Sequence, residues 1–117
     1  MREGLIKLVS SIVGEEQQAS MEKFPLFHSA HEGYAVILEE VDELKAEIEG
    51  VEGINNLMDY LWDYIKLNSI NTLNLIDDIE QRAINVACEA VQVAAMCRKF
   101  KESMKTNNGR NKRVRHR

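Results

Sequence analysis

The sequence has little that stops a helix or builds a sheet, with one proline and six glycines in 117 residues. No stretch alternates polar and apolar residues with a period of two, the pattern of a half-buried strand. The hydrophobic share, 44%, and the charged share, 29%, are ordinary for a globular protein. We therefore expect an all-α protein with one core.

Long apolar runs are also missing. Nothing approaches the ~18 consecutive apolar residues of a membrane span, and the first residues, MREGLIKLVSSIVGEE, lack the uninterrupted apolar core of a signal peptide. We expect a cytoplasmic protein with no membrane partner. Cys88 and Cys97 lie nine residues apart on opposite faces of one expected helix, so they neither pair nor share a metal. Reduced, partly buried thiols fit that compartment.

Charge is unevenly distributed along the chain. Residues 101–117 hold seven Lys or Arg and one Glu, a net of +6, so the first hundred residues carry −10 of the total −4. An acidic body is not a nucleic-acid surface, and we expect no nucleic-acid partner. The signal Asn107-Asn108-Gly109 predicts a helix stop. We therefore expect a single all-α domain over 1–105 and a basic, disordered tail over 106–117.

Apolar residues recur at helical spacing in four stretches. They predict four helices with short links, typical of an antiparallel helical bundle, over 3–20, 29–50, 54–67 and 72–104. Pro25 separates the first two helices. Ser29 is expected to cap the second helix and Glu32 to complete a capping box, and Gly50 is expected to end it.

The last expected helix carries two apolar faces. One is predicted to face the core: Ile76, Ile79, Ala83, Val86, Ala90, Val93, Cys97 and Phe100. A second set is predicted to face outward: Ile84, Cys88, Val91 and Ala95. Trp62 with Tyr60 and Tyr64 adds apolar surface on the third helix. Exposed apolar surface usually marks an interface, so we expect a homodimer or homotetramer in which the long helices pair across a two-fold axis.

Three carboxylates crowd one side of the second helix. Glu40 and Glu43 are three residues apart, and Glu39 and Glu43 are four apart. Like charges at these spacings repel, and a hard divalent cation would reverse that cost. The alternative interpretation is a solvated acidic face. Glu89 and Gln92, also three apart, would face Glu40 and Glu43 if the two helices pack antiparallel.

The segments HEGYAVILEEVDEL and EAVQVAAMCRKF resemble the MazG-like, all-alpha nucleoside triphosphate pyrophosphatases, especially the small versions of phages and prophages. The family pattern is EExxE on one helix and ExxD on another. Residues 39–43 match the first motif in full. Residues 89–92 match the second except that Gln92 replaces Asp. The gap between the motifs is longer than in the family, because the helix over 54–67 looks inserted.

The resemblance implies a MazG-like fold and a reaction that splits nucleoside triphosphates into monophosphate and pyrophosphate, in a house-cleaning or phage nucleotide-pool role. It implies Mg²⁺, or alternatively Mn²⁺, held by Glu40, Glu43, Glu89 and Gln92. Glu39 is the candidate catalytic residue, orienting water. Two alternatives stay open: a catalytically divergent interaction protein, and a nucleic-acid accessory protein that uses the basic tail.

Three further residues are candidates for binding the substrate. His31 lies at a helix N-terminus, where backbone N–H groups attract phosphate. Together with His28 it suggests zinc, but no Cys or third His accompanies the pair. Arg98 and Lys99, two turns beyond Gln92, are expected to meet the outer phosphates. Their alternative role is to offset the helix dipole.

Overall fold

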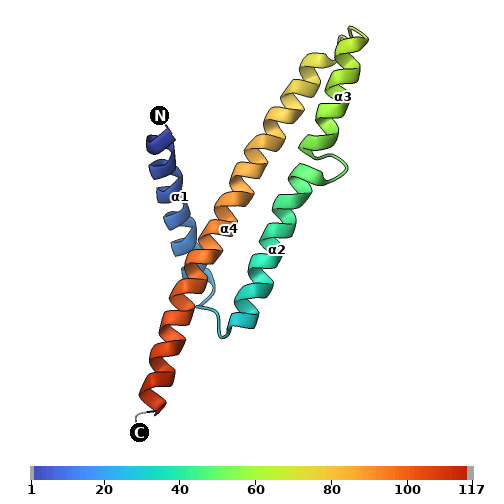
Figure 1. The fold of residues 1–117 in the computed structure, drawn as a ribbon. Coiled ribbons are helices and arrows are strands. Elements are labelled where there is room, and N and C mark those ends of the chain that lie inside the picture. Colours follow the sequence, from blue (N-terminus) through green and yellow to red (C-terminus); the bar gives the residue numbers. More distant parts are fainter. Residues whose placement is uncertain (1, 116–117) are drawn as a thin grey trace. The chain divides into compact units, whose positions relative to one another are not determined.

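A computed structural model describes the backbone of residues 2–115 and the side chains of residues 2–106. The described backbone contains helices and short links but no strand, so the predicted all-α class is confirmed. The helices are α1 (Arg2–Lys23), α2 (Ala30–Glu49), α3 (Ile54–Lys66) and α4 (Thr72–Arg115) (Figure 1). None of the described helices combines the length and apolarity needed to cross a bilayer.

Local signals set the ends of α2. The Ser29 Oγ accepts a hydrogen bond of 3.2 Å from the backbone N–H of Glu32, which is the predicted cap. The Glu32 carboxylate accepts one of 3.3 Å from the N–H of His28, one residue before the donor expected in a capping box. The helix ends at Glu49, directly before Gly50, as predicted.

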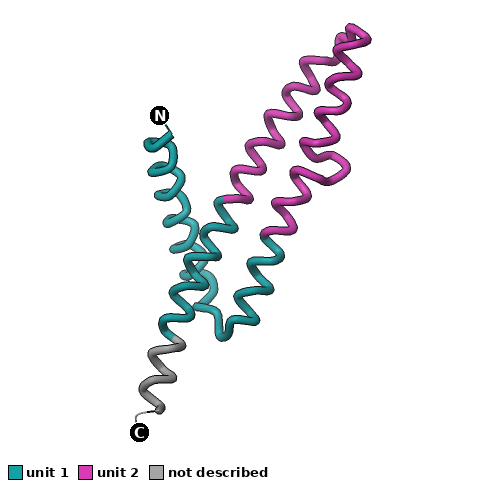
Figure 2. The backbone as a smooth tube through the Cα atoms, in the orientation of Figure 1, with its two compact units in different colours: residues 1–40, 91–117 teal, residues 41–90 magenta. Residues whose placement is uncertain are grey.

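The chain divides into two compact units, shown in Figure 2. Unit 1 comprises Met1–Glu40 and Val91–Arg117, and unit 2 comprises Val41–Ala90. The core of unit 1 consists of buried side chains from α1, the following link and α4: Val13, Phe27, Ala95 and Met96. In this unit α2 passes so close to α4 that a Cβ on Gly33 would overlap the ring of Phe100.

Unit 2 buries less apolar surface. Leu75 is its one buried large apolar side chain among the described residues, whereas Trp62 of α3 is 60% exposed. A polar contact joins its elements instead. The Arg82 guanidinium of α4 pairs with Glu47 of α2 at 3.2 Å and with Glu52 of the α2–α3 turn at 3.0 Å.

The predicted faces of α4 are partly wrong. Ile76, Ala83, Ala90 and Cys97, expected in the core, are exposed, and Ala95, expected outside, is fully buried. The inward face instead includes many polar residues among its buried and half-buried positions: Leu75, Ile79, Arg82, Val86, Glu89, Gln92, Met96, Lys99 and Ser103. Apolar spacing predicted Ile79 and Val86 on this face correctly, but it missed the polar members, because those side chains find partners inside.

Two smaller predictions also fail. Cys88 and Cys97 are both exposed rather than partly buried. The helix predicted to end near residue 104 continues to Arg115, past the stop expected at 107–109. A single Gly inside a helix costs only about 1 kcal/mol, too little to end a helix by itself. The disorder predicted for the tail over 106–117 stays a prediction, because the side chains of residues 107–117 lie outside the described residues.

Candidate functional site

Two carboxylates from facing helices come together in unit 2. Glu43 of α2 and Glu89 of α4 have oxygen atoms within 4.8 Å of each other. Glu43 is exposed and Glu89 is half-buried. Among the described side chains, neither forms an ion pair with a cation. The expected meeting of the two helices at these positions is therefore observed within this unit.

This arrangement perturbs Glu89. Burial raises the pKa of its carboxyl above the ordinary value, and the negative charge of Glu43, a side-chain hydrogen bond with Glu43 and the charge of Glu47 raise it further. Arg82 forms its ion pairs with Glu47 and Glu52, so it does not neutralise Glu43 or Glu89 by an ion pair. The two carboxylates therefore form a local excess of negative charge.

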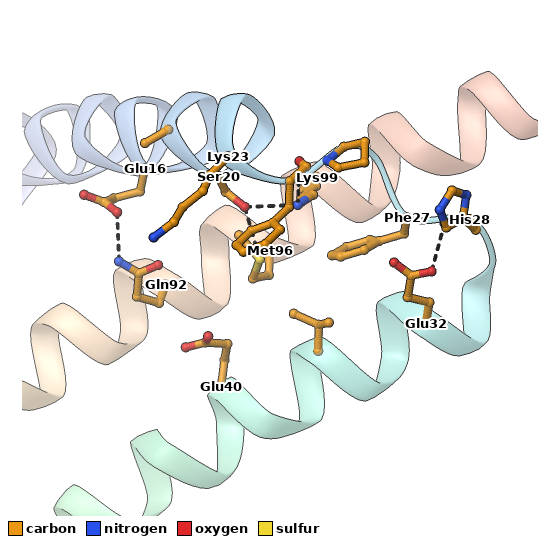
Figure 3. A pocket seen from close by; sticks show the side chains of 14 residues that line it. Glu16, Ser20, Lys23, Phe27, His28, Glu32, Glu40, Gln92, Met96 and Lys99 are labelled. Atoms are coloured by element: carbon orange, nitrogen blue, oxygen red, sulfur yellow. Dashed lines mark hydrogen bonds between the residues drawn. The ribbon is translucent and has the colours of Figure 1, made fainter.

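The other two predicted metal ligands line a pocket in unit 1. Glu40 precedes Glu43 by one turn on α2, and Gln92 follows Glu89 by one turn on α4. The pocket has a volume of about 770 Å³. It is lined by residues from α1, the following link, α2 and α4: Glu16, Ala19, Ser20, Lys23, Phe24, Pro25, Phe27, His28, Glu32, Val36, Glu40, Gln92, Met96 and Lys99 (Figure 3).

One end of this pocket is acidic. The Gln92 side-chain amide donates a hydrogen bond of 2.9 Å to the Glu16 carboxylate of α1, and Figure 3 shows Glu40 across from them on α2. Since its N–H group is used by Glu16, Gln92 positions a carboxylate of α1 at this end of the pocket. Glu16 has no motif around it in the sequence, so sequence reasoning missed it.

The other end holds a buried cation. Lys99 is 3% exposed. Its ammonium donates to the Ser20 hydroxyl at 3.1 Å and to the backbone carbonyl of Phe24 at 3.3 Å, and lies 4.8 Å from the centre of the Phe27 ring. Burial lowers the Lys99 pKa, and the charge of Glu32 partly opposes that shift. No carboxylate of the described residues pairs with it directly.

The remaining predicted residues lie apart from the pocket lining. Glu39 and His31 are exposed and do not line it. Arg98 donates to the backbone carbonyl of Ser10 at 3.0 Å and to the Ser10 hydroxyl at 2.7 Å. Arg98 therefore attaches α1 to α4, whereas Lys99, its neighbour, belongs to the pocket. His28 lines the pocket in place of His31.

No protein-family model, curated protein or solved structure matches the chain.

Proposed function

We propose that this chain is a Mg²⁺-dependent nucleoside triphosphate pyrophosphohydrolase, built as a MazG-like four-helix bundle and active as a cytoplasmic homo-oligomer. The observation that carries the proposal is the approach of Glu43 and Glu89 from facing helices. Their sequence contexts are the two segments that resemble the family. A solvated acidic face would not require carboxylates of two helices to approach within 4.8 Å.

The donor set fits a hard divalent cation. Glu43 and Glu89 of unit 2 would supply carboxylate oxygens, the ligand type that Mg²⁺ prefers. Glu40 and Gln92 stay sequence predictions for two further oxygen ligands. Helical spacing places Glu40 on the same side of α2 as Glu43, and Gln92 on the same side of α4 as Glu89. Bound Mg²⁺ would neutralise phosphate charge and lower the pKa of a coordinated water.

The pocket residues of unit 1 have the chemistry to bind parts of a nucleotide. Phe27, Met96 and Val36 offer apolar walls to a base. Burying an unpaired ammonium is costly, so an anionic group near Lys99 would be stabilised. Glu16, positioned by its hydrogen bond from Gln92, would accept a proton from an attacking water. Glu39 stays a prediction for that role.

The test is pyrophosphate release from a panel of NTPs and dNTPs with Mg²⁺. Glu40→Gln and Glu43→Gln should each abolish release while the helical circular dichroism signal persists, because each removes ligand charge. Asp42→Asn, an exposed carboxylate on the same helix, is the matched control and should retain activity. Full activity in both glutamate variants would refute this choice of carboxylates, and no release from any nucleotide would refute the enzyme.

One observation favours a second candidate, an interaction protein that keeps the fold without catalysis. Gln92 replaces a charged ligand and its amide is engaged by Glu16. Restoring the carboxylate with Gln92→Asp separates the two candidates by calorimetry. A rise in Mg²⁺ affinity supports the metal site, and no Mg²⁺ binding in either form supports the non-catalytic protein. The nucleic-acid alternative rests on tail side chains outside the described residues.

A further inference from the structure

The hairpin that α3 forms with the first part of α4, within unit 2, has one polar side. A pocket of about 430 Å³ lies there, lined by Glu52, Leu57, Asp78, Gln81, Arg82 and Asn85. A helix turns about 100° per residue. The α4 residues of this pocket therefore lie on one side of the buried Leu75, whereas Ile76 and Ala83 lie on the other.

The opposite side of the same hairpin is apolar. On α3, Met58, Trp62 and Ile65 recur at spacings of four and three residues and are turned away from Leu57 of the pocket. They are displaced around α3 in the same sense as the exposed α4 residues are around α4. Because the two helices run antiparallel within this unit (Figure 2), both sets share one side. This hairpin face consists of five exposed residues: Met58, Trp62, Ile65, Ile76 and Ala83.

Carboxylates border the hairpin face. Asp59 precedes Trp62 by three residues on α3, and Glu80 follows Ile76 by four residues on α4, so each carboxylate lies beside an apolar member. Both are exposed, and among the described side chains neither forms an ion pair. Unit 2 as a whole holds eleven Asp or Glu and three Lys or Arg, a net of −8. The hairpin face is therefore an apolar strip within a strongly acidic surface.

We propose that the hairpin face binds a basic amphipathic helix of another protein. Two packed helices leave a groove along their line of contact, and a third helix can lay its apolar face into such a groove. Trp62 and Met58 are of the side-chain types that are enriched in interfaces. Lysine or arginine side chains beside the partner's apolar face pair with Asp59 and Glu80. This binding is independent of whether the chain hydrolyses nucleotides.

The charge of unit 2 disfavours other partners for this face. An anionic membrane surface or a nucleic acid would be repelled by a net charge of −8. Lys66 adds no free positive charge here, because it pairs with Asp63 at 3.3 Å. A second copy that paired through the same face would set carboxylates against carboxylates. Exposed apolar side chains of unit 1, such as Leu5 and Ile6, remain available to a second copy.

Trp62 makes the contact measurable, because it is the only tryptophan of the chain. The probe is a helical peptide of leucine and lysine with one apolar face, added to the full chain. It should shift Trp62 fluorescence to shorter wavelength, saturably at micromolar concentration, and rising salt should weaken the binding. The control peptide has glutamate in place of every lysine and should cause no shift. Equal shifts with both peptides, or no shift with either, would overturn the proposal.

Matched charge reversals locate the binding site. Asp59→Lys combined with Glu80→Lys should weaken binding of the leucine–lysine peptide about tenfold or more, because like charges then face each other. Asp42→Lys combined with Glu49→Lys changes the net charge equally at exposed positions of α2. This control should keep the affinity within about twofold, because distant exposed charges are screened. Equal weakening in the two double variants would overturn the proposal, since the peptide would then respond to net charge alone.

Two further measurements separate this partner from other occupants of the hairpin face. Vesicles of phosphatidylcholine and phosphatidylserine should leave Trp62 fluorescence unchanged, and so should dilution of the chain without peptide. A shift to shorter wavelength with vesicles would overturn the proposal in favour of a membrane surface. A shift that depends on the concentration of the chain alone would overturn it in favour of a second copy.

Discussion

Glu89 is a carboxylate held close to other carboxylates, and this has a consequence for stability. Its pKa is raised in the folded chain, by burial first and by Glu43 next. Below the ordinary glutamate pKa, the Glu89 carboxyl is protonated in both the folded and the unfolded chain, so it does not lower the free energy of unfolding. As pH rises, the unfolded chain loses its proton first, so the free energy of unfolding falls until the folded pKa is passed.

Glu89→Gln should therefore raise the melting temperature at neutral pH in EDTA, and this gain should vanish near pH ~3. With Mg²⁺ present the order should reverse, because the wild type gains a ligand-dependent stabilisation that the variant lacks. Thermal melts across pH, with the exposed Glu49→Gln as control, provide the measurement. A gain that is equal at both pH values would show that charge repulsion is not its cause.

Glu16 provides a second test at the residue scale. Removing a group that orients a metal ligand typically costs 10- to 100-fold in metal affinity or activity. Glu16→Gln should cause a loss of about that size in pyrophosphate release. The neighbouring Glu15→Gln should cause none, since Glu15 is exposed and does not line the pocket. A variant with a lower melting temperature but unchanged pyrophosphate release would give Glu16 a purely structural role.

At the scale of elements, α2 packs tightly against α4 at Gly33. A Cβ on Gly33 would overlap the Phe100 ring, whereas one on Gly4 of α1 would meet nothing within 4 Å. Gly33→Ala should lower the free energy of unfolding by about 1–3 kcal/mol through overpacking. Gly4→Ala should raise it by up to about 1 kcal/mol through helix propensity. Urea denaturation measures both, and an equal response at the two glycines would contradict this packing.

Element ends were predictable where the cause is local. Pro25 and the Ser29 cap act on their own neighbours, so the sequence pattern placed the start of α2 correctly. The faces of α4 depend on partners far along the chain, such as Glu47 for Arg82 and Glu16 for Gln92. Hydrophobic spacing cannot anticipate that polar side chains turn inward to meet such partners.

The same distinction between local and long-range causes explains which residues of the candidate site were predicted. Glu43 and Glu89 were found because each lies in a motif on its own helix. Glu16 and Ser20 were missed because only folding brings α1 to α4 at these positions. Arg98 and Lys99 are adjacent in sequence but have different surroundings. Arg98 donates a hydrogen bond to Ser10, whereas Lys99 is buried in the pocket.

At the scale of the whole molecule, large apolar side chains are exposed on several of the described helices, among them Leu5 and Ile6 of α1, Trp62 of α3 and Leu73 of α4. Monomeric proteins rarely leave such patches uncovered.

Stability should therefore depend on protein concentration, because the second copy binds only the folded chain. A hundredfold rise in partner concentration above the dissociation constant is worth about 2.7 kcal/mol. The melting temperature should thus rise by about 5 °C or more between roughly 1 and 100 µM. A melting temperature that stays constant over that range in the wild type would show that the exposed apolar faces are not covered by another copy of the chain.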